Sequence, residues 1–271
     1  DVDRSRGLGD VYKRQLYLSA NNFLDKGQSV LLRDRHWGPY KGFLENNSLS
    51  YETWPLLPPN GSDQHPFFAK EEFESKLAEL CEKQDKVMVW LNDPAHNPTG
   101  LSMSPKGRSV CLESFVDSAL SNPDVGHTLL IDSAYSLYAN ETHAWGDTIV
   151  ESLENGLMWP ENLLFSVAIS LSKSHTIYGL RTGALVSMHP EKEVTDRMDT
   201  VLCVTARQTW SATPRVSQHC VSEMHSSEEG GEAWSKERDR LKSLLDNRRN
   251  TLVAECEKLG VPLNPTCLLY T

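Results

Sequence analysis

Residues 170–183 read S-L-S-K-S-H-T-I-Y-G-L-R-T-G and follow a run of strand-forming residues at 163–169. One lysine, Lys173, stands just past the predicted strand, and Arg181 follows between two glycines. A lysine at the end of a buried strand is poorly solvated, which favours its neutral, nucleophilic form. Nearby serine hydroxyls and an arginine are suited to holding a phosphate. The stretch therefore combines a nucleophile with a predicted phosphate site.

These are the groups needed to attach a phosphorylated aldehyde cofactor, pyridoxal phosphate, through a Schiff base. In this interpretation Lys173 makes the covalent bond, and Ser170 and Arg181 bind the phosphate. Ser172 is a weaker phosphate candidate. Taken alone, the stretch is equally compatible with a surface loop that carries a solvated lysine.

Two upstream stretches place further polar residues at strand ends. Residues 130–135 read L-I-D-S-A-Y, an apolar strand that ends in Asp132 and is followed by Tyr135. Residues 91–100 read L-N-D-P-A-H-N-P-T-G, a strand end that runs into a loop presenting Asn97. In open α/β sheets, ligands bind outside the carboxyl ends of the strands. We therefore expect these residues to meet the lysine in one site.

Three motifs thus occur in chain order: N-P-T-G, D-x-A-Y and S-x-S-K-x-x-x-x-x-G-x-R-x-G. In this order they resemble the class I/II aminotransferases, which are pyridoxal-phosphate enzymes of the aspartate aminotransferase fold (fold type I). The resemblance covers residues 16–266. It implies that Lys173 binds the cofactor and then moves the substrate proton as general base and acid. It also implies that Asp132 pairs with the pyridine nitrogen, and that Tyr135 and Asn97 hydrogen-bond the cofactor's 3′-oxygen.

The resemblance also suggests roles for residues outside the three motifs. An aromatic residue at the position of Trp37 stacks on the cofactor ring in the family, although Trp37 is also compatible with ordinary packing. Some relatives have a histidine three residues later, where this chain has Tyr40, so a histidine relay is not expected here. Arg207 resembles an arginine that reaches a neighbouring subunit's substrate in the aspartate-specific branch. A solvated surface arginine is the equally weighted alternative.

Composition limits the class of protein. The 271 residues are 39% hydrophobic and 24% charged, as in an ordinary globular protein. A formal net charge of −10 argues against nucleic acid or an anionic membrane surface as a partner. No apolar run approaches the ~20 residues that a membrane helix needs. The six cysteines form no C-x-x-C pair, so neither a metal site nor a disulfide framework is expected, and a reducing cytoplasm is the default location.

Both ends of the chain differ from the rest. Residues 5–15, SRGLGDVYKRQ, match the in-frame translation of a transposase adapter used in sequencing libraries, and residues 267–271, CLLYT, match its reverse complement. We therefore expect 1–15 and 267–271 to be adapter-derived, and the remainder to be an internal fragment that lacks a phosphate-binding glycine loop and is inactive by itself. An unusual natural terminus is the alternative.

The hydrophobic pattern predicts an α/β fold: a three-layer α/β/α large domain with a mainly parallel sheet. This cofactor-binding domain is expected over 16–230, and a long helix over 231–266 is expected to begin a truncated small domain. Strands are expected over 29–32, 49–54, 87–91, 127–132, 163–169 and 184–188, and helices over 16–25, 70–83, 105–121, 146–154, 191–206, 214–225 and 232–259.

The function predicted first is transfer of an amino group from an amino acid to a 2-oxo acid by a pyridoxal-phosphate-dependent homodimer. Two alternatives use the same lysine, aspartate and tyrosine. One is another fold-type I enzyme, a C–S lyase or a β-decarboxylase. The other is the effector-sensing domain of a transcription regulator, which a DNA-binding module upstream of Leu16 would indicate.

Overall fold

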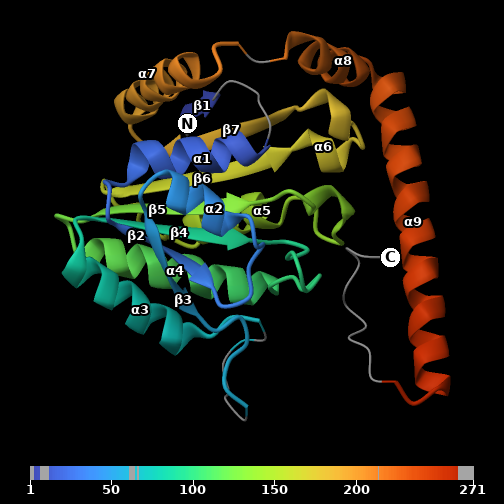
Figure 1. Cartoon of the computed structure of the whole chain (residues 1–271), viewed down its shortest axis with the longest axis horizontal. Coiled ribbons are helices and arrows are strands. Elements are labelled where there is room, and N and C mark those ends of the chain that lie inside the picture. Colours follow the sequence, from blue (N-terminus) through green and yellow to red (C-terminus); the bar gives the residue numbers. More distant parts are fainter. Residues whose placement is uncertain (1–2, 7–11, 61–64, 66, 213, 262–271) are drawn as a thin grey trace.

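A single mixed sheet organises the molecule. The computed structural model describes residues 3–6, 12–60, 65, 67–212 and 214–261. Within them the strand order is β1-β7-β6-β5-β4-β2-β3 (Figure 1). The strands are β1 (Asp3–Arg6), β2 (Ser29–Arg33), β3 (Ser50–Trp54), β4 (Lys86–Asn92), β5 (Gly126–Asp132), β6 (Leu163–Ser170) and β7 (Gly183–His189). Strands β3, β2, β4, β5 and β6 run parallel, whereas β7 is antiparallel to both of its neighbours.

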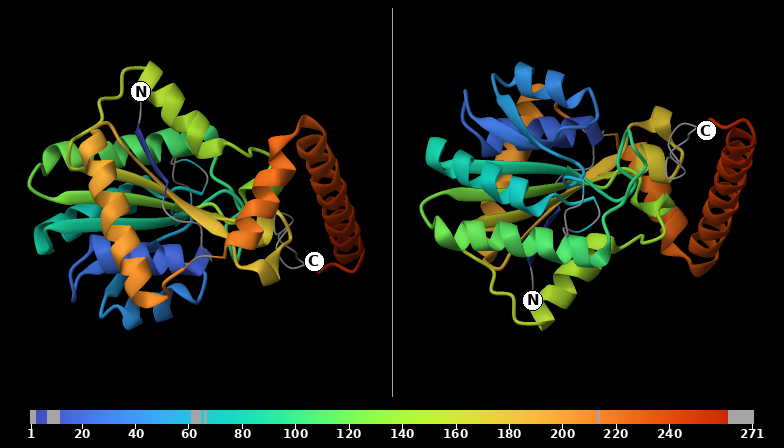
Figure 2. Two further views of the ribbon diagram at one scale, coloured as in Figure 1. Left: turned by 90° about the horizontal axis from the view of Figure 1, so that it is seen from above. Right: turned by 90° about the horizontal axis from the view of Figure 1, so that it is seen from below.

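Helices cover both faces of this sheet (Figure 2). They are α1 (Tyr12–Phe23), α2 (Tyr40–Asn46), α3 (Lys70–Lys83), α4 (Pro105–Ser121), α5 (Ala144–Glu154), α6 (Leu171–Ser174), α7 (Lys192–Thr209), α8 (Arg215–Ser226) and α9 (Glu228–Lys258). Short 3₁₀ turns lie at Ser136–Tyr138 and Tyr178–Leu180. The prediction of an α/β fold with a mainly parallel sheet is confirmed.

Strand β4 shows why the protein has three layers. Successive side chains of a strand point to opposite faces. Val87 and Val89 accordingly pack with α3, α4 and α5, whereas Met88 and Trp90 pack with α1, α2 and α7. All four side chains are buried, so the strand reads as one continuous apolar run. Two hydrophobic cores therefore lie on opposite faces of the sheet.

The N-terminal part of the chain differs from the predicted elements. The first helix begins at Tyr12 rather than at Leu16, and Leu16 itself is fully buried. Asp3–Arg6 lies within the predicted adapter-derived segment, yet it forms an edge strand on β7. A short extended segment can join an exposed sheet edge through backbone hydrogen bonds alone. The other predicted adapter-derived segment, 267–271, lies outside the described residues.

Helix α9 runs past the edge where the parallel strands end (Figure 1). The predicted apolar face comprises Leu241, Leu245, Arg248, Leu252, Glu255 and Leu259. Only its first part faces the molecule: Leu241 and Leu245 are half-buried, whereas Leu252 and Leu259 are 44% and 76% exposed. The C-terminal end of α9 is nevertheless well formed, because Gly260 adopts φ +68° and the Val261 N–H donates to the Cys256 carbonyl, as in a Schellman motif.

No helix in the described part of the chain is both long enough and apolar enough to cross a membrane.

Helix α4 begins with an N-cap serine followed by proline, and this cap also ends the loop after β4. The Ser104 hydroxyl accepts a 3.0 Å hydrogen bond from the Gly107 N–H, and Pro105 occupies the first helical position. We expect Ser104→Ala to lower the free energy of unfolding by about 1 kcal/mol, because it leaves that N–H without its cap. Urea denaturation measures this loss. Ser109→Ala, one turn later, is the matched control and should change stability by less than half as much.

Candidate active site

The register of the parallel strands brings three strand ends together. Asn92, the last residue of β4, pairs with Asp132, the last residue of β5. Asp132 in turn pairs with Ala168 of β6, two residues before Ser170. The Asn92 side chain also donates a 2.8 Å hydrogen bond to the Asp132 backbone carbonyl. The predicted site residues that follow these strands therefore lie in loops at the carboxyl ends of β4, β5 and β6.

Asp132 is the most buried of the predicted site residues. Its side chain is fully enclosed, and burial raises the pKa of its carboxyl well above the usual value, although the Ala134 N–H opposes that shift. One carboxyl oxygen accepts from the Ala134 N–H at 3.2 Å, and the other accepts from the Tyr40 hydroxyl. A buried carboxylate is costly unless a cation or further donors meet it. Asp132 is thus suited to a positively charged N–H partner.

Lys173 lies in the short helix α6, directly after β6. It is half-buried, and its Nζ atom is 4.8 Å from the centre of the Tyr178 ring and 5.7 Å from that of Tyr135. A cavity of about 400 Å³ opens beside these groups. The cavity is lined by Ala95, Tyr135, Tyr138, Ser172, Lys173, Thr176, Tyr178, Lys242, Leu245 and Asp246. The structure therefore brings the lysine and Tyr135 together at a space large enough for a small molecule.

Ser170 and Ser172, which directly precede Lys173, have buried hydroxyl groups. Their side chains are 1% and 5% exposed, and neither hydroxyl finds a hydrogen-bond partner within the described residues. Buried polar groups in proteins are normally hydrogen-bonded, so two such hydroxyls in one turn need an explanation. A bound anion such as a phosphate, which accepts from hydroxyl groups, would supply it.

Arg181 adopts a left-handed backbone conformation, with φ +57°. For a residue other than glycine this conformation costs about 1 kcal/mol. Its guanidinium lies 4.9 Å from the centre of the Tyr178 ring, and one N–H donates to the Tyr178 carbonyl. The same ring contacts Lys173, so Arg181 belongs to the surroundings of the lysine.

Trp37 and Asn97 occupy loops after β2 and β4. Trp37 is half-buried and packs edge-on against Tyr40, with ring centres 5.7 Å apart. The backbone N–H of Asn97 donates to the side chain of Asn92, which ties the loop to the end of β4. Arg207, by contrast, is exposed in the last turn of α7, and within the described residues no contact joins it to the other predicted site residues.

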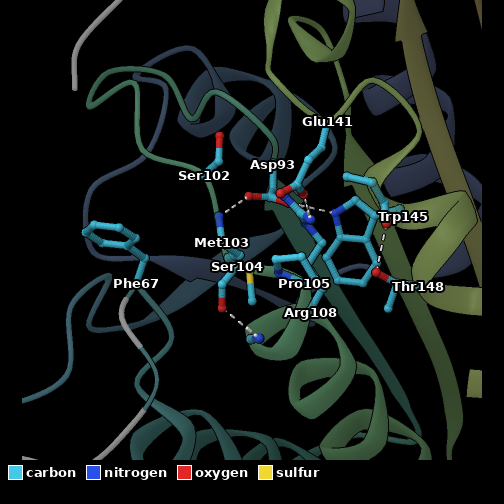
Figure 3. A network of polar contacts seen from close by, with 12 residues as sticks. Phe67, Asp93, Ser102, Met103, Ser104, Pro105, Arg108, Glu141, Trp145 and Thr148 are labelled. Carbon is cyan, nitrogen blue, oxygen red and sulfur yellow. Dashed lines mark hydrogen bonds and ion pairs between the residues drawn. The ribbon is translucent and has the colours of Figure 1, made fainter. Parts of the chain in front are cut away.

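A buried polar network, which the sequence did not reveal, holds the loops after β4 and β5 (Figure 3). Asp93, with no exposed surface, accepts from Arg108 Nε at 2.8 Å, from Trp145 Nε1 at 3.0 Å and from the Met103 N–H at 2.7 Å. A second nitrogen of Arg108 pairs with Glu141. The network thus closes the loop that presents Asn97 and fixes the segment that follows Tyr135. Asp93 stands at a strand end, but nothing local identifies its distant partners.

A ring cluster, also absent from the sequence prediction, ties α6 to α8 and α9. The His175 ring stacks on Trp234 with ring centres 4.7 Å apart, and its Nε2 lies 3.0 Å from that of His225. Burial, and secondarily His225, lower the pKa of His175 to about 4, so this ring is neutral at pH 7. His175 is two residues beyond Lys173, so the cluster anchors the lysine segment. The described residues contain no cluster of three side chains that could hold a metal ion.

The pattern that defines aminotransferase class I and II matches residues 15–267 of this sequence. The chain belongs to the class I and II aminotransferases. An aromatic-amino-acid aminotransferase of Paracoccus denitrificans is 27% identical over 70% of this chain, and the cytoplasmic aspartate aminotransferase of Schizosaccharomyces pombe is 23% identical over 94%. The matches cover 45% and 58% of those two relatives, so the chain spans about half their length.

Solved aminotransferase structures share the fold. An aminotransferase from Anaerococcus prevotii superposes with a TM-score of 0.84 at 24% identity, covering 98% of this chain and 62% of its own. An aromatic-amino-acid aminotransferase from Burkholderia pseudomallei, covalently bound to pyridoxal phosphate, gives a TM-score of 0.73 at 20% identity, covering 98% of this chain and 62% of its own. The predicted fold class is thereby confirmed, and the match to residues 15–267 confirms the predicted family.

The polar groups at this edge of the sheet fit pyridoxal phosphate. Two partnerless buried hydroxyls suit its phosphate, and a fully buried carboxyl suits its ring nitrogen. Lys173 directly follows the two serines in the chain and lines a cavity. The chain therefore has separate groups that fit the two ends of the cofactor.

We expect loss of the Arg108–Asp93 pair to be strongly destabilising. Arg108→Met should lower the free energy of unfolding by about 3–5 kcal/mol, because it leaves a buried carboxylate without its cation. Arg197→Met, which removes an exposed ion pair on α7, is the matched control and should cost less than about 1 kcal/mol. Urea denaturation of both variants tests this. Equal, small losses would show that the buried pair does not stabilise the fold.

Asp132 should also make stability depend on pH in the cofactor-free chain. A carboxyl whose pKa is raised by folding stabilises the folded state at low pH, and this contribution is lost as pH rises above the unfolded value of 3.8. Asn does not titrate, so Asp132→Asn should not lose stability in this way. The variant should therefore become more stable relative to the parent chain between pH 5 and pH 8. Urea denaturation at both pH values measures the difference. The exposed Asp117→Asn is the control, and a pH-independent difference for Asp132→Asn would contradict the assignment.

Proposed function

We propose that this chain is the catalytic part of a pyridoxal-phosphate-dependent aminotransferase, which moves an amino group from an amino acid to a 2-oxo acid. The observation that carries the proposal is that a fully buried Asp132 ends β5 and Lys173 follows the neighbouring parallel strand β6. The two partnerless hydroxyls beside the lysine support it independently, because they suit a phosphate group.

Each residue has a separate task in this proposal. Ser170, Ser172 and Arg181 would hold the phosphate, and Asp132 would accept a hydrogen bond from the protonated ring nitrogen. Asn97 and Tyr135 would donate to the ring oxygen, and Trp37 would pack against the ring. When bound, pyridoxal phosphate supplies an electron sink for the electron pair left on the substrate α-carbon.

In this proposal Lys173 carries out the proton transfer. Lys173 would hold the cofactor through its Nζ atom. Once freed by the incoming amino acid, the same Nζ atom would serve as the base that takes the proton from the substrate α-carbon and then as the acid that gives it back. Tyr135, whose ring centre lies 5.7 Å from Nζ, limits the directions that the amine can take. Positioning of this kind is a large part of enzymatic rate enhancement.

The relatives support amino acids and 2-oxo acids as the substrate class. Their names include aspartate and aromatic-amino-acid aminotransferases, and we infer a substrate from one of these two groups. Arg207, exposed on α7, remains the predicted contact to a substrate in a partner subunit of a homodimer. We further propose a cytoplasmic location, as in the yeast relative. The proposed division is a cofactor domain at 16–230 and the start of a small domain at 231–266.

Mapping of the covalent cofactor bond tests the proposal. After incubation of the chain with pyridoxal phosphate and reduction with borohydride, we expect peptide mass spectrometry to find the adduct on Lys173. Lys242 is the built-in control, because it lines the same cavity but donates to the Ala139 carbonyl. Lys173→Ala should abolish the adduct, whereas Lys242→Ala should retain it. An adduct on Lys242 with Lys173 unmodified would refute the assignment.

A further inference from the structure

Tyr40 is the one side chain that donates to the Asp132 carboxyl group within the described residues. It opens helix α2, and its hydroxyl donates to Asp132 across 92 residues of sequence. The side chain is 1% exposed, and burial raises the pKa of the phenol far above its usual value, although Arg33 opposes that shift. The hydroxyl therefore keeps its proton and remains a donor throughout the pH range of protein stability.

Aromatic neighbours fix the Tyr40 ring. Trp90 and Trp37 pack edge-on against it, with ring centres 5.2 Å and 5.7 Å away, and His36 lies parallel to it at 6.3 Å. The Tyr40 N–H also donates to the Trp37 carbonyl, which fixes the start of the helix. A hydroxyl held in this way costs little conformational entropy when it bonds a partner. It therefore fixes the orientation of the carboxyl group it contacts.

We propose that Tyr40 is a positioning residue, whose hydroxyl orients the Asp132 carboxylate and favours its charged form for the cofactor ring nitrogen. Two donors act on the carboxyl: the Ala134 N–H holds one oxygen and Tyr40 holds the other. Each oxygen retains acceptor capacity, since a carboxylate offers about four lone-pair sites. Hydrogen bonds to the charged form offset the desolvation that would otherwise keep the buried acid neutral.

The inference rests on the proposed function, and cofactor analogues separate the two. Pyridoxal phosphate has a ring nitrogen that Asp132 can meet, whereas its deaza analogue has a carbon there and keeps the aldehyde and phosphate. Removing the Tyr40 hydroxyl with Tyr40→Phe should weaken pyridoxal phosphate binding about ten-fold, the effect of losing a hydrogen bond to a charged group. Binding of the deaza analogue should change less than two-fold. Visible absorbance of the lysine-bound aldehydes, titrated into the 271-residue chain, gives both dissociation constants.

Three further variants sharpen the test. Tyr51→Phe is the matched control, because Tyr51 packs against the same aromatic cluster without touching Asp132, and it should leave both affinities unchanged. In an Asp132→Asn background, Tyr40→Phe should no longer distinguish the two aldehydes, because the residues act as a unit. If Tyr40→Phe fails to give a cooperative unfolding transition, Tyr40→fluorotyrosine replaces it. This stronger donor should tighten pyridoxal phosphate binding relative to the analogue.

The outcomes are distinct. Selective loss for pyridoxal phosphate supports the positioning role. Equal losses for both aldehydes would mean that Tyr40 only packs, and no loss would mean that Asp132 does not need it; either result overturns the inference while the proposed function stands. If the unaltered chain binds neither aldehyde at Lys173, the proposed function fails and the inference fails with it.

Discussion

The parallel register of β4, β5 and β6 is the constraint on which the site depends. It sets Asn92 beside Asp132, and Asp132 beside the strand that ends at Ser170. Parallel strands need long crossover connections, and here α4 and α5 supply them. Because each crossover makes the next strand run in the same direction, all three strands end on the same side of the sheet. Loops that are far apart in sequence therefore begin next to one another. A shift of β5 by one residue against both of its neighbours would turn the Asp132 side chain to the opposite face of the sheet.

Strand ends alone leave the loops undefined, and the structure closes them with buried polar contacts. Asp93 accepts three hydrogen bonds, from Arg108, Trp145 and the Met103 backbone. The buried ion pair of Asp93 with Arg108 adds little stability compared with apolar residues in the same place, yet burying either charge without its partner is costly. The network therefore penalises every arrangement in which the loop and α4 separate. Its contribution is mainly to specify one loop conformation beside the sheet.

Local signals in the sequence were sufficient for most of the fold. The helices predicted over 70–83 and 105–121 have the observed bounds, because apolar spacing and, for the second, a Ser-Pro start define them. The three motifs likewise predicted that Asn97, Asp132 and Lys173 lie at the carboxyl ends of strands, and these strands are neighbours in the sheet. The contacts that were missed join residues distant in sequence, such as Tyr40 with Asp132 and Arg108 with Glu141. No periodicity encodes those pairs, since they depend on the relative placement of separate elements.

The stack of His175 on Trp234 has a mechanical consequence. Trp234 belongs to the first third of α9, a helix of 31 residues with no fully buried side chain. His175 lies two residues after Lys173, and its ring is held from the other side by the Ser174 hydroxyl at 2.8 Å. A displacement of α9 must therefore either break the stack or carry the lysine segment with it. The position of α9 is therefore coupled, through Trp234 and His175, to the position of the Lys173 amine.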